Sequence, residues 1–376
     1  MFKLSPNEEE RAVRLHHEAV VIDSLGGYEV LTDAVKQRID EMIDQDKALT
    51  FIFDEIARMN TENPPEKSPQ WQEHRQASGV SAISTTMGPF GEEMWSYENA
   101  VRDIAAWLYK FDVVDELIKV CSSEDIEYAK QEGKLGIILN FQNTAHIRSN
   151  LENLDFFYQL GIRVTQLTYN DLNLVGAGCT ERSDCGLSSF GLKVVERMNK
   201  LGMLIDVSHT GFQTTMDTIE ASDAPVAFTH TVCKAVRDHD RGKTDEQMEA
   251  LAKKDGYMGI VVVPGFVTDQ PHATLEHFLE HVDHAVKVMG ADKVGIGTDL
   301  ADAYEPLATK MNRDLLAQLG FREEHMADFN MKIEGYRGFQ DFSNLTRGLV
   351  TRGYSDDDVK GILGGNFLRL FKEVVG

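Results

Sequence analysis

The stretch MLIDVSHTGFQTTMDTIEASDAPVAFTHT, residues 203–231, contains the pattern that decides the fold of this chain. Two apolar runs, MLIDVSH and PVAFTHT, predict buried strands, and each carries a histidine at or next to its end, His209 and His230. A more polar segment of helical length separates the two runs. Buried strands joined through a helix are the repeating unit of a parallel sheet covered by helices. The stretch therefore predicts an α/β fold.

The same strand-and-helix unit recurs along the chain. The apolar runs are nearly continuous, which indicates burial on both faces of each strand. Eight such units close most naturally into a (β/α)₈ barrel, with an open, doubly wound sheet as the alternative. The eight runs are AVVID (19–23), GVSAISTTM (79–87), LGIILNFQ (135–142), VTQLTYN (164–170), MLIDVSH (203–209), PVAFTHT (225–231), GYMGIVVVPG (256–265) and KVGIGTDL (293–300).

The chain is longer than such a barrel requires. Barrels of this kind usually take about 250 residues, and this chain has 376. No linker or repeat divides the sequence, so we expect a single domain over 1–376 with additions. The larger addition is a helical insertion at about 31–78, after the first strand, and the other is a C-terminal helical tail from about 305. An insertion at this point is expected beside the barrel's catalytic mouth.

Charge and hydropathy exclude several classes of partner. The formal net charge is -23, so the field of the protein repels phosphate backbones and anionic lipid surfaces. No apolar run reaches the roughly 18 residues of a membrane span, and the acidic start MFKLSPNEEE does not resemble a signal peptide. We expect a cytoplasmic protein with a small-molecule substrate, with no nucleic-acid or membrane partner. The sequence leaves open whether the chain forms a homo-oligomer.

Polar residues close most of the predicted strands. Active sites of such barrels lie at the carboxyl ends of the strands, so these residues are expected to meet. His209 and His230 could share one Zn²⁺ or a similar ion, and Asp299 could then take a proton from water. A hydrogen-bonded structural histidine is the competing interpretation for each one alone. The full set of strand-end residues is Gln142, Tyr169, Asn170, His209, His230 and Asp299.

A second histidine pattern offers another metal site. HFLEH, residues 277–281, has the H-x-x-E-H spacing that can mark a zinc protease helix. The segment continues as a charged amphipathic helix leading into the eighth strand, which would lie on the outside of a barrel. We therefore favour the strand-end site over a metalloprotease.

Several segments together resemble the membrane (renal) dipeptidase family, the M19 peptidases of the amidohydrolase superfamily. The resemblance covers about residues 19–371 except the insertion. It implies a metal at His209 and His230, an acid/base at Asp299, and an arginine, Arg241, that holds a substrate carboxylate. The segments that carry it are GLSSFGLKVVERMNKLGMLIDVSHTGFQTTMDTIEASDAPVAFTHT (186–231), DHDRGKTDEQMEALAKKDGYMGIVVV (238–263), VGIGTDL (294–300) and GILGGNFLRLF (361–371).

The chain departs from the family's pattern at the first metal. The family's first-strand His-x-Asp pair corresponds here to Leu25 and Gly27, its bridging glutamate to Gln142, and its fourth-strand histidine to Tyr169. These changes indicate that one metal site is lost and one is kept, so the resemblance implies one divalent ion, expected to be zinc. Tyr169 could donate a hydrogen bond to a developing oxyanion. Gln142 and Asn170 are expected to contact the substrate.

The expected function is a metal-dependent, dipeptidase-like hydrolase of a small carboxylate-bearing amide or another C–N bond. One alternative is a non-hydrolytic member of the same fold that performs lyase or C–C cleavage chemistry. The other is a catalytically inactive binding protein.

Overall fold

Eight parallel strands form a nearly closed barrel in the computed structural model, which describes residues 2–88, 95–300, 304–321 and 333–376. Every pairing between neighbouring strands is parallel. This confirms the predicted α/β barrel over the open sheet. In their order around the barrel, the strands are β1 (Val21–Asp23), β2 (Val80–Thr86), β4 (Leu135–Phe141), β5 (Ile162–Gln166), β6 (Leu204–Asp206), β7 (Ala227–Cys233), β9 (Tyr257–Ile260) and β10 (Val294–Ile296).

Each of the eight predicted apolar runs contains or overlaps one barrel strand. Two further strands were not predicted from the sequence. β3 (Leu117–Lys119) pairs with β4, and β8 (Gly242–Lys243) pairs with β7. Strands of two or three residues are too short to show a periodic pattern, so the sequence gives no signal for them.

The first and last strands meet through hydrogen bonds that close the barrel. The Asp23 carboxylate accepts hydrogen bonds from the Thr298 backbone N–H at 2.8 Å and from its hydroxyl at 2.6 Å. Asp23 and Thr298 are both fully buried. Three backbone hydrogen bonds lie along the same seam: Ser24 N to Ile296 O at 3.0 Å, Asp299 N to Leu25 O at 2.9 Å, and Gly27 N to Leu300 O at 3.0 Å.

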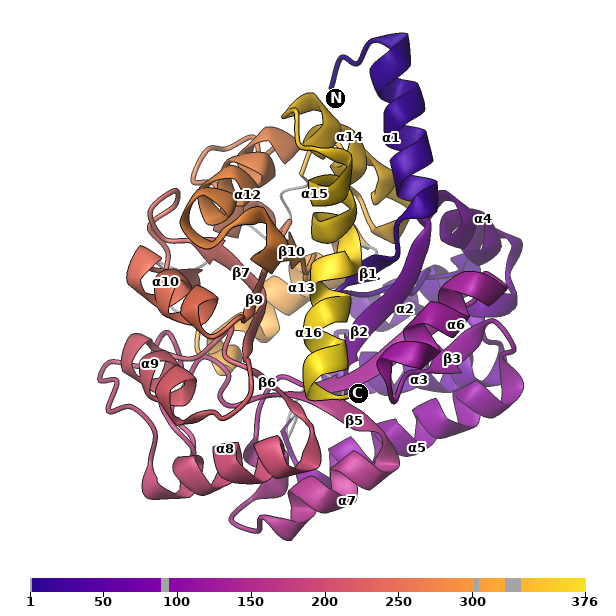
Figure 1. The fold of residues 1–376 in the computed structure, drawn as a ribbon. Coiled ribbons are helices and arrows are strands. Elements are labelled where there is room, and N and C mark those ends of the chain that lie inside the picture. The colour runs from indigo at the N-terminus through magenta and orange to yellow at the C-terminus, as the bar shows by residue number, and fades with distance from the viewer. Residues whose placement is uncertain (1, 89–94, 301–303, 322–332) are drawn as a thin grey trace.

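Helices surround the barrel, as Figure 1 shows. α8 illustrates how the sequence sets their ends: the Ser188 hydroxyl accepts from the Gly191 N–H at its start, and Gly202 ends it with φ +69°. The helices are α1 (Pro6–Glu18), α2 (Asp33–Asp44), α3 (Leu49–Glu62), α4 (Pro69–Ser78), α5 (Tyr97–Val113), α6 (Ser123–Glu132), α7 (Glu152–Leu160), α8 (Ser189–Leu201), α9 (Phe212–Ala221), α10 (Asp245–Lys253), α11 (Pro264–Val267), α12 (Leu275–Met289), α13 (Glu305–Asp314), α14 (Ser343–Thr351), α15 (Asp356–Lys360) and α16 (Asn366–Val374).

Short helical turns complete the structure. One of them, η7 (Gly361–Gly365), is a π-helical turn that leads into α16. The others are the 3-10 turns η1 (Pro65–Lys67), η2 (Ala145–Ile147), η3 (Ala291–Lys293), η4 (Leu316–Leu319) and η6 (Phe339–Asp341). Within the described residues, no helix has the length and apolar character needed to cross a membrane.

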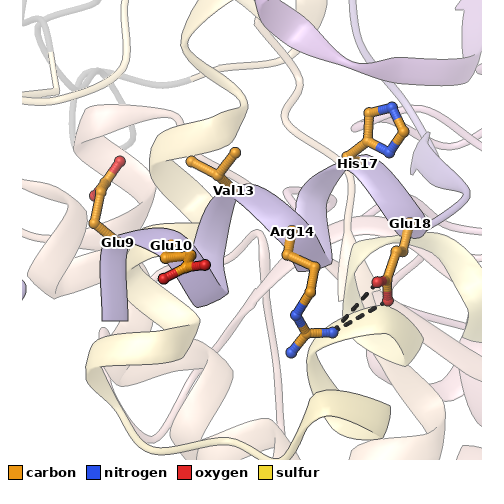
Figure 2. Close-up of a pocket in the computed structure, with 6 residues that line it drawn as sticks. All are labelled: Glu9, Glu10, Val13, Arg14, His17 and Glu18. Atoms are coloured by element: carbon orange, nitrogen blue, oxygen red, sulfur yellow. Dashed lines mark hydrogen bonds and ion pairs between the residues drawn. The ribbon is translucent and has the colours of Figure 1, made fainter. Parts of the chain in front are cut away.

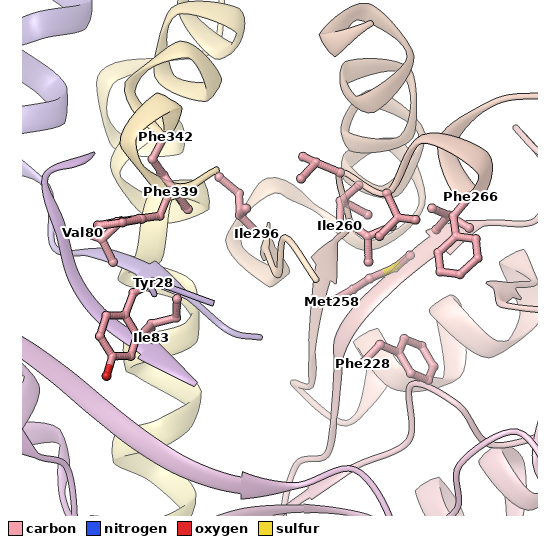
Figure 3. Packing of buried hydrophobic residues seen from close by; sticks show 14 of the residues in the cluster. Tyr28, Val80, Ile83, Phe228, Met258, Ile260, Phe266, Ile296, Phe339 and Phe342 are labelled. Carbon is pink, nitrogen blue, oxygen red and sulfur yellow. The ribbon is translucent and has the colours of Figure 1, made fainter. Parts of the chain in front are cut away.

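Buried apolar side chains fill the space between the barrel and its helices. Figure 3 shows side chains from strands far apart in the sequence, such as Ile83, Phe228 and Ile260, together with Phe342 from the C-terminal segment. All four of these side chains are buried. Burying a large apolar side chain typically stabilises a fold by about 1.5–3 kcal/mol, so this core links the two ends of the chain.

Helix α16 covers the end of the barrel at which the strands begin. Its Phe367, Leu370 and Phe371 pack against Ile22 and Leu204, near the starts of β1 and β6. Figure 1 is seen from this side, with α16 in front and α2, α3 and α13 behind the strands. One end of the barrel is therefore closed by apolar packing, and the opposite end, where the strands finish, is available for chemistry.

Candidate active site

A cavity of about 850 Å³ lies at the carboxyl ends of the barrel strands. Four residues that the sequence placed at strand ends line it: Gln142, Tyr169, His209 and Asp299. The structure therefore brings together side chains from the ends of the third, fourth, fifth and eighth strands of the barrel. His230, Asn170 and Arg241 do not line the cavity and are fully buried beside it.

Helices outside the barrel form much of the cavity wall. α3 and α4, from the segment between β1 and β2, contribute residues such as Ile56 and His74. α5 contributes Asp103 and Trp107, and α13 contributes Leu307. Because the first of these helices follow the end of β1, they reach the same face of the barrel as the strand-end residues.

His209 and His230 lie side by side. Their Nε2 atoms are 2.9 Å apart, and both side chains are almost completely buried. Burial lowers the pKa of both imidazoles well below the usual range, and the positive charge of Arg241 adds to this effect. Both histidines are therefore neutral at neutral pH, which is the form that binds metal ions.

A layer of polar groups surrounds this histidine pair. Nδ1 of His209 is 2.8 Å from Asn170 Oδ1, and Nδ1 of His230 is 2.8 Å from the Thr229 hydroxyl. That hydroxyl donates to Asp206 Oδ2 at 2.6 Å. Asp206 and Thr229 were not identified from the sequence. The available signal was a charged residue inside the apolar run MLIDVSH.

Asp299 follows β10 in an unusual backbone conformation. Its φ is +54°, in the left-handed region that residues other than glycine rarely adopt. Burial raises the pKa of Asp299 to about 6, although the positive charge of Arg241 opposes this shift. The carboxylate makes no ion pair within the described residues. A carboxyl group that titrates near pH 6 in a cavity is suited to proton transfer.

Tyr169 packs flat against His209. The two ring centroids are 4.1 Å apart with an angle of 21° between the planes. Burial raises the pKa of the Tyr169 hydroxyl, so it stays protonated and can donate a hydrogen bond. Gln142, also at the cavity wall, donates from Nε2 to the Thr86 hydroxyl at 2.8 Å.

Arg241 lies behind the two histidines. Its guanidinium donates to the backbone carbonyls of Ser208 at 2.7 Å and of His230 at 3.1 Å. Its Nε has no hydrogen-bond partner within the described residues. The guanidinium carbon is 5.6 Å from the ring centroid of Phe266, which lines the cavity. Arg241 thus places a positive charge close to the site.

The residues that correspond to the family's first-strand metal pair have no metal-binding side chain. Leu25 and Gly27 line the cavity, and their backbones take part in the hydrogen bonds between β1 and β10. Across the parts of the chain that the structure describes, no group of three or more His, Cys, Asp or Glu side chains could hold a metal ion. Within those parts of the chain, His209 and His230 are therefore a pair of nitrogen donors without a third His, Cys, Asp or Glu ligand.

An acidic wall also borders the cavity, and its Asp103 was not identified from the sequence. Burial raises the pKa of Glu29, and it raises the pKa of Asp103 to about 6. The nearby Lys110 ammonium is 3.1 Å from the buried Glu66 carboxylate. Among the described residues, neither Glu29 nor Asp103 has an ion-pair partner within 4.0 Å, so no cation in direct contact balances either carboxyl group when it is ionised.

The H-x-x-E-H segment has structural roles. The Thr274 N–H donates to His277 Nδ1 at 3.1 Å at the start of α12. His281 is fully buried, accepts from the Cys233 N–H at 3.0 Å, and lies 3.1 Å from the Val267 carbonyl. Its two ring nitrogens are thus used within the fold, as expected for a helix that packs on the barrel.

A second hollow, of about 540 Å³, lies along α1. It is lined by one helix alone, and Figure 2 shows Arg14 paired with Glu18 in it. None of the strand-end residues contributes to this hollow, so it is separate from the candidate active site.

Residues 102–329 match the sequence profile of membrane dipeptidase, peptidase family M19. This match spans more than half of the chain and includes both histidines, Tyr169, Arg241 and Asp299. The chain belongs to the M19 membrane dipeptidase family.

Two curated relatives with dipeptidase names have the same sequence identity to this chain. An uncharacterised dipeptidase of Schizosaccharomyces pombe is 26% identical over 263 residues, covering 67% of this chain and 56% of that protein. Dipeptidase 3 of Rattus norvegicus is 26% identical over 305 residues, covering 76% of this chain and 57% of that protein. The chain spans just over half the length of these two relatives.

Solved structures share the barrel over nearly the full length of the chain. An amidohydrolase from Pseudomonas aeruginosa superposes with a TM-score of 0.78 at 27% identity, covering 96% of this chain and 98% of that one. The probable dipeptidase PvdM from the same organism has a TM-score of 0.75 at 20% identity, with 99% of both chains covered. The second likeness shows a shared fold.

Proposed function

We propose that this M19 protein is a single-metal hydrolase that cleaves a small, carboxylate-bearing amide of the dipeptide type. The observation that carries the proposal is the pair of neutral imidazole Nε2 atoms, 2.9 Å apart, beside a cavity that contains Asp299 and Tyr169. The dipeptidase names of the curated relatives support the reaction class.

The donor set fits one zinc-like ion. Nitrogen ligands lie about 2.0–2.1 Å from zinc, so two nitrogens 2.9 Å apart can reach the same ion. When bound, such an ion supplies Lewis-acid polarisation and lowers the pKa of a bound water. With only His209 and His230 as protein ligands we expect weak affinity, because catalytic zinc sites usually have three.

Asp299 and Tyr169 can divide the proton transfer and charge stabilisation of amide hydrolysis. Ionised above its pKa of about 6, Asp299 can accept a proton from the attacking water and later pass it to the leaving amine. The protonated Tyr169 hydroxyl can donate a hydrogen bond to the oxygen on which negative charge develops. Both residues line the same cavity, as this division requires.

The charges around the cavity support a zwitterionic substrate. Arg241 supplies positive potential for a carboxylate, and Glu29 and Asp103 supply negative charge for an ammonium group. Gln142 is at the cavity wall and can contact the substrate. Asn170 is buried with both side-chain ends used by the protein, so we assign it to the support of His209.

Metal content and the origin of the product oxygen test this function together. The purified protein is expected to contain at most one divalent ion per chain by elemental analysis. His209→Ala and His230→Ala should each lose the ion and the activity, because each removes one of two ligands. Reaction of dipeptides in H₂¹⁸O should place one ¹⁸O atom in the new carboxylate.

The alternatives give different results in the same experiments. Product formation without ¹⁸O would replace hydrolysis with lyase or C–C cleavage chemistry. Substrate binding without turnover, unchanged in His209→Ala, would indicate an inactive binding protein. Two ions per chain would overturn the single-metal assignment.

A further inference from the structure

The side chain of Asn170 fixes the position of one proton on His209. Asn170 Nδ2 donates to the Leu319 carbonyl at 2.7 Å, and a carbonyl oxygen can only accept a hydrogen bond. The other end of the amide, Oδ1, therefore faces His209 Nδ1 at 2.8 Å. Since Oδ1 is also an acceptor, His209 Nδ1 must carry the hydrogen.

Thr229 fixes the proton of His230 by similar logic. Its single hydroxyl hydrogen is directed to Asp206 Oδ2 at 2.6 Å. Asp206 Oδ1 already accepts from the Ser208 N–H at 2.9 Å and from the Ser208 hydroxyl at 2.5 Å, which leaves Oδ2 as the acceptor for Thr229. The Thr229 oxygen is then an acceptor toward His230 Nδ1 at 2.8 Å, so this Nδ1 also carries a hydrogen.

The two tautomers have a consequence for the space between the rings. A neutral imidazole carries one N–H hydrogen, so both Nε2 atoms are bare acceptors. Two such atoms 2.9 Å apart repel each other unless a positive species lies between or beside them.

We propose that Asn170 and Thr229, the latter anchored by Asp206, are positioning residues that hold His209 and His230 as Nδ1–H tautomers whose Nε2 lone pairs converge on one divalent cation. The proposal rests on the single-metal function above. In it, these residues fix the tautomer and the orientation of His209 and His230 before the ion binds. Partners of this kind typically change metal affinity by about 10- to 100-fold.

Substitution of Thr229 tests the contact with His230. Thr229→Val keeps the shape of the side chain but removes the hydroxyl, so His230 can move its proton to Nε2. We expect the Zn²⁺ affinity of metal-stripped protein, measured by competition with a chromophoric chelator, to fall by about 10- to 100-fold. Thr229→Ser keeps the hydroxyl and should restore an affinity close to that of the wild type.

A matched control separates this effect from general damage to Asp206. Ser208→Ala removes the other hydroxyl that donates to Asp206, and with it the acceptor of the His230 N–H at 3.1 Å, but it keeps the Thr229 hydroxyl beside His230 Nδ1. Its Zn²⁺ affinity should fall less than that of Thr229→Val. The positioning role would be overturned if Thr229→Val bound Zn²⁺ as tightly as the wild type. It would also be overturned if Ser208→Ala and Thr229→Val lost the same amount of Zn²⁺ affinity.

The tautomers themselves can be observed by long-range ¹H–¹⁵N spectroscopy of the ¹⁵N-histidine-labelled, metal-stripped protein. His209→Gln and His230→Gln assign the two signals, which should both show the Nδ1–H form. Asn170→Leu should release His209 alone from this form. An Nε2–H form at either ring in the wild type refutes the proposal even if Zn²⁺ binds. If the protein does not bind Zn²⁺, the single-metal function is refuted. The spectra still show which ring nitrogen carries the hydrogen in each histidine.

Discussion

Asp299 shows how the backbone places one functional group. Its φ of +54° is outside the usual range for aspartate, and its N–H donates to the Leu25 carbonyl at 2.9 Å. Such a conformation persists only where surrounding contacts enforce it, and it commonly occurs at functional sites. Here the hydrogen bond to the first strand supplies one such contact, so the position of the carboxylate depends on closure of the barrel.

Asp299→Asn is expected to reduce kcat/KM by about 10²- to 10⁴-fold, because the amide cannot accept the proton. In the wild type, kcat/KM should rise as the pH increases through about 6, since Asp299 becomes ionised there. The residual activity of the variant should not show this rise of kcat/KM with pH. Zn²⁺ content measured on the same preparations is the control. A variant that keeps wild-type activity would exclude Asp299 as the base.

At the scale of elements, the helices between β1 and β2 both pack against the rest of the protein and form part of the cavity wall. Trp71 on α4 and Ile52 on α3 are fully buried, and the Trp71 indole donates to the Tyr28 carbonyl at 3.2 Å. Ile56, on α3, lines the cavity. Phe51 on the same helix is 64% exposed. α3 thus has one surface in the cavity wall and another in solvent.

Ile56→Trp is expected to narrow the cavity and lower kcat/KM for dipeptide substrates. A misfit of this size in a binding pocket costs on the order of 1–3 kcal/mol, or about tenfold or more in kcat/KM. Zn²⁺ affinity should not change, because Ile56 is neither a metal ligand nor a hydrogen-bond partner of either histidine. Phe51→Ala on the exposed surface of α3 is the matched control. Unchanged kinetics in Ile56→Trp would show that α3 is remote from the bound substrate.

For the whole molecule, closure of the barrel depends on the seam between β1 and β10. Asp23 and Thr298 are 275 residues apart in the sequence and form two hydrogen bonds inside the protein. Burial raises the pKa of Asp23 to about 7 despite these bonds. A folded-state pKa above the unfolded value means that the folded protein loses stability as the pH rises toward 7. The Thr298 hydroxyl limits this loss by stabilising the ionised form.

Thr298→Val should lower the free energy of unfolding by about 1–3 kcal/mol at pH 8, because a buried carboxylate loses a hydrogen-bond donor. The loss should be smaller at pH 6, where Asp23 is largely protonated in the folded state. Urea denaturation at both pH values measures the effect. Thr351→Val, at an exposed site on α14, should change stability by no more than about 0.5 kcal/mol. An equal loss at both pH values would contradict the assigned role of Asp23.

The sequence by itself determined the barrel and the candidates at its strand ends. Apolar runs and their spacing are local properties of the chain, and the rule that parallel strands point their carboxyl ends to one face brings His209, Tyr169 and Asp299 together. Tertiary structure alone decided how Asn170 and Thr229 orient the histidines. Such contacts join segments that are distant along the chain, so hydrophobic patterning carries no signal for them.

Contacts between distant segments also determine the cavity wall and the seam between β1 and β10. The sequence showed that an insertion follows the first strand, but which surface of α3 faces the cavity depends on how the helix packs on its neighbours. The pairing of Asp23 with Thr298 likewise exists only when the first and last strands meet. Local preference fixes which segments are strands and helices, whereas burial and hydrogen bonding between distant segments fix the geometry of the site.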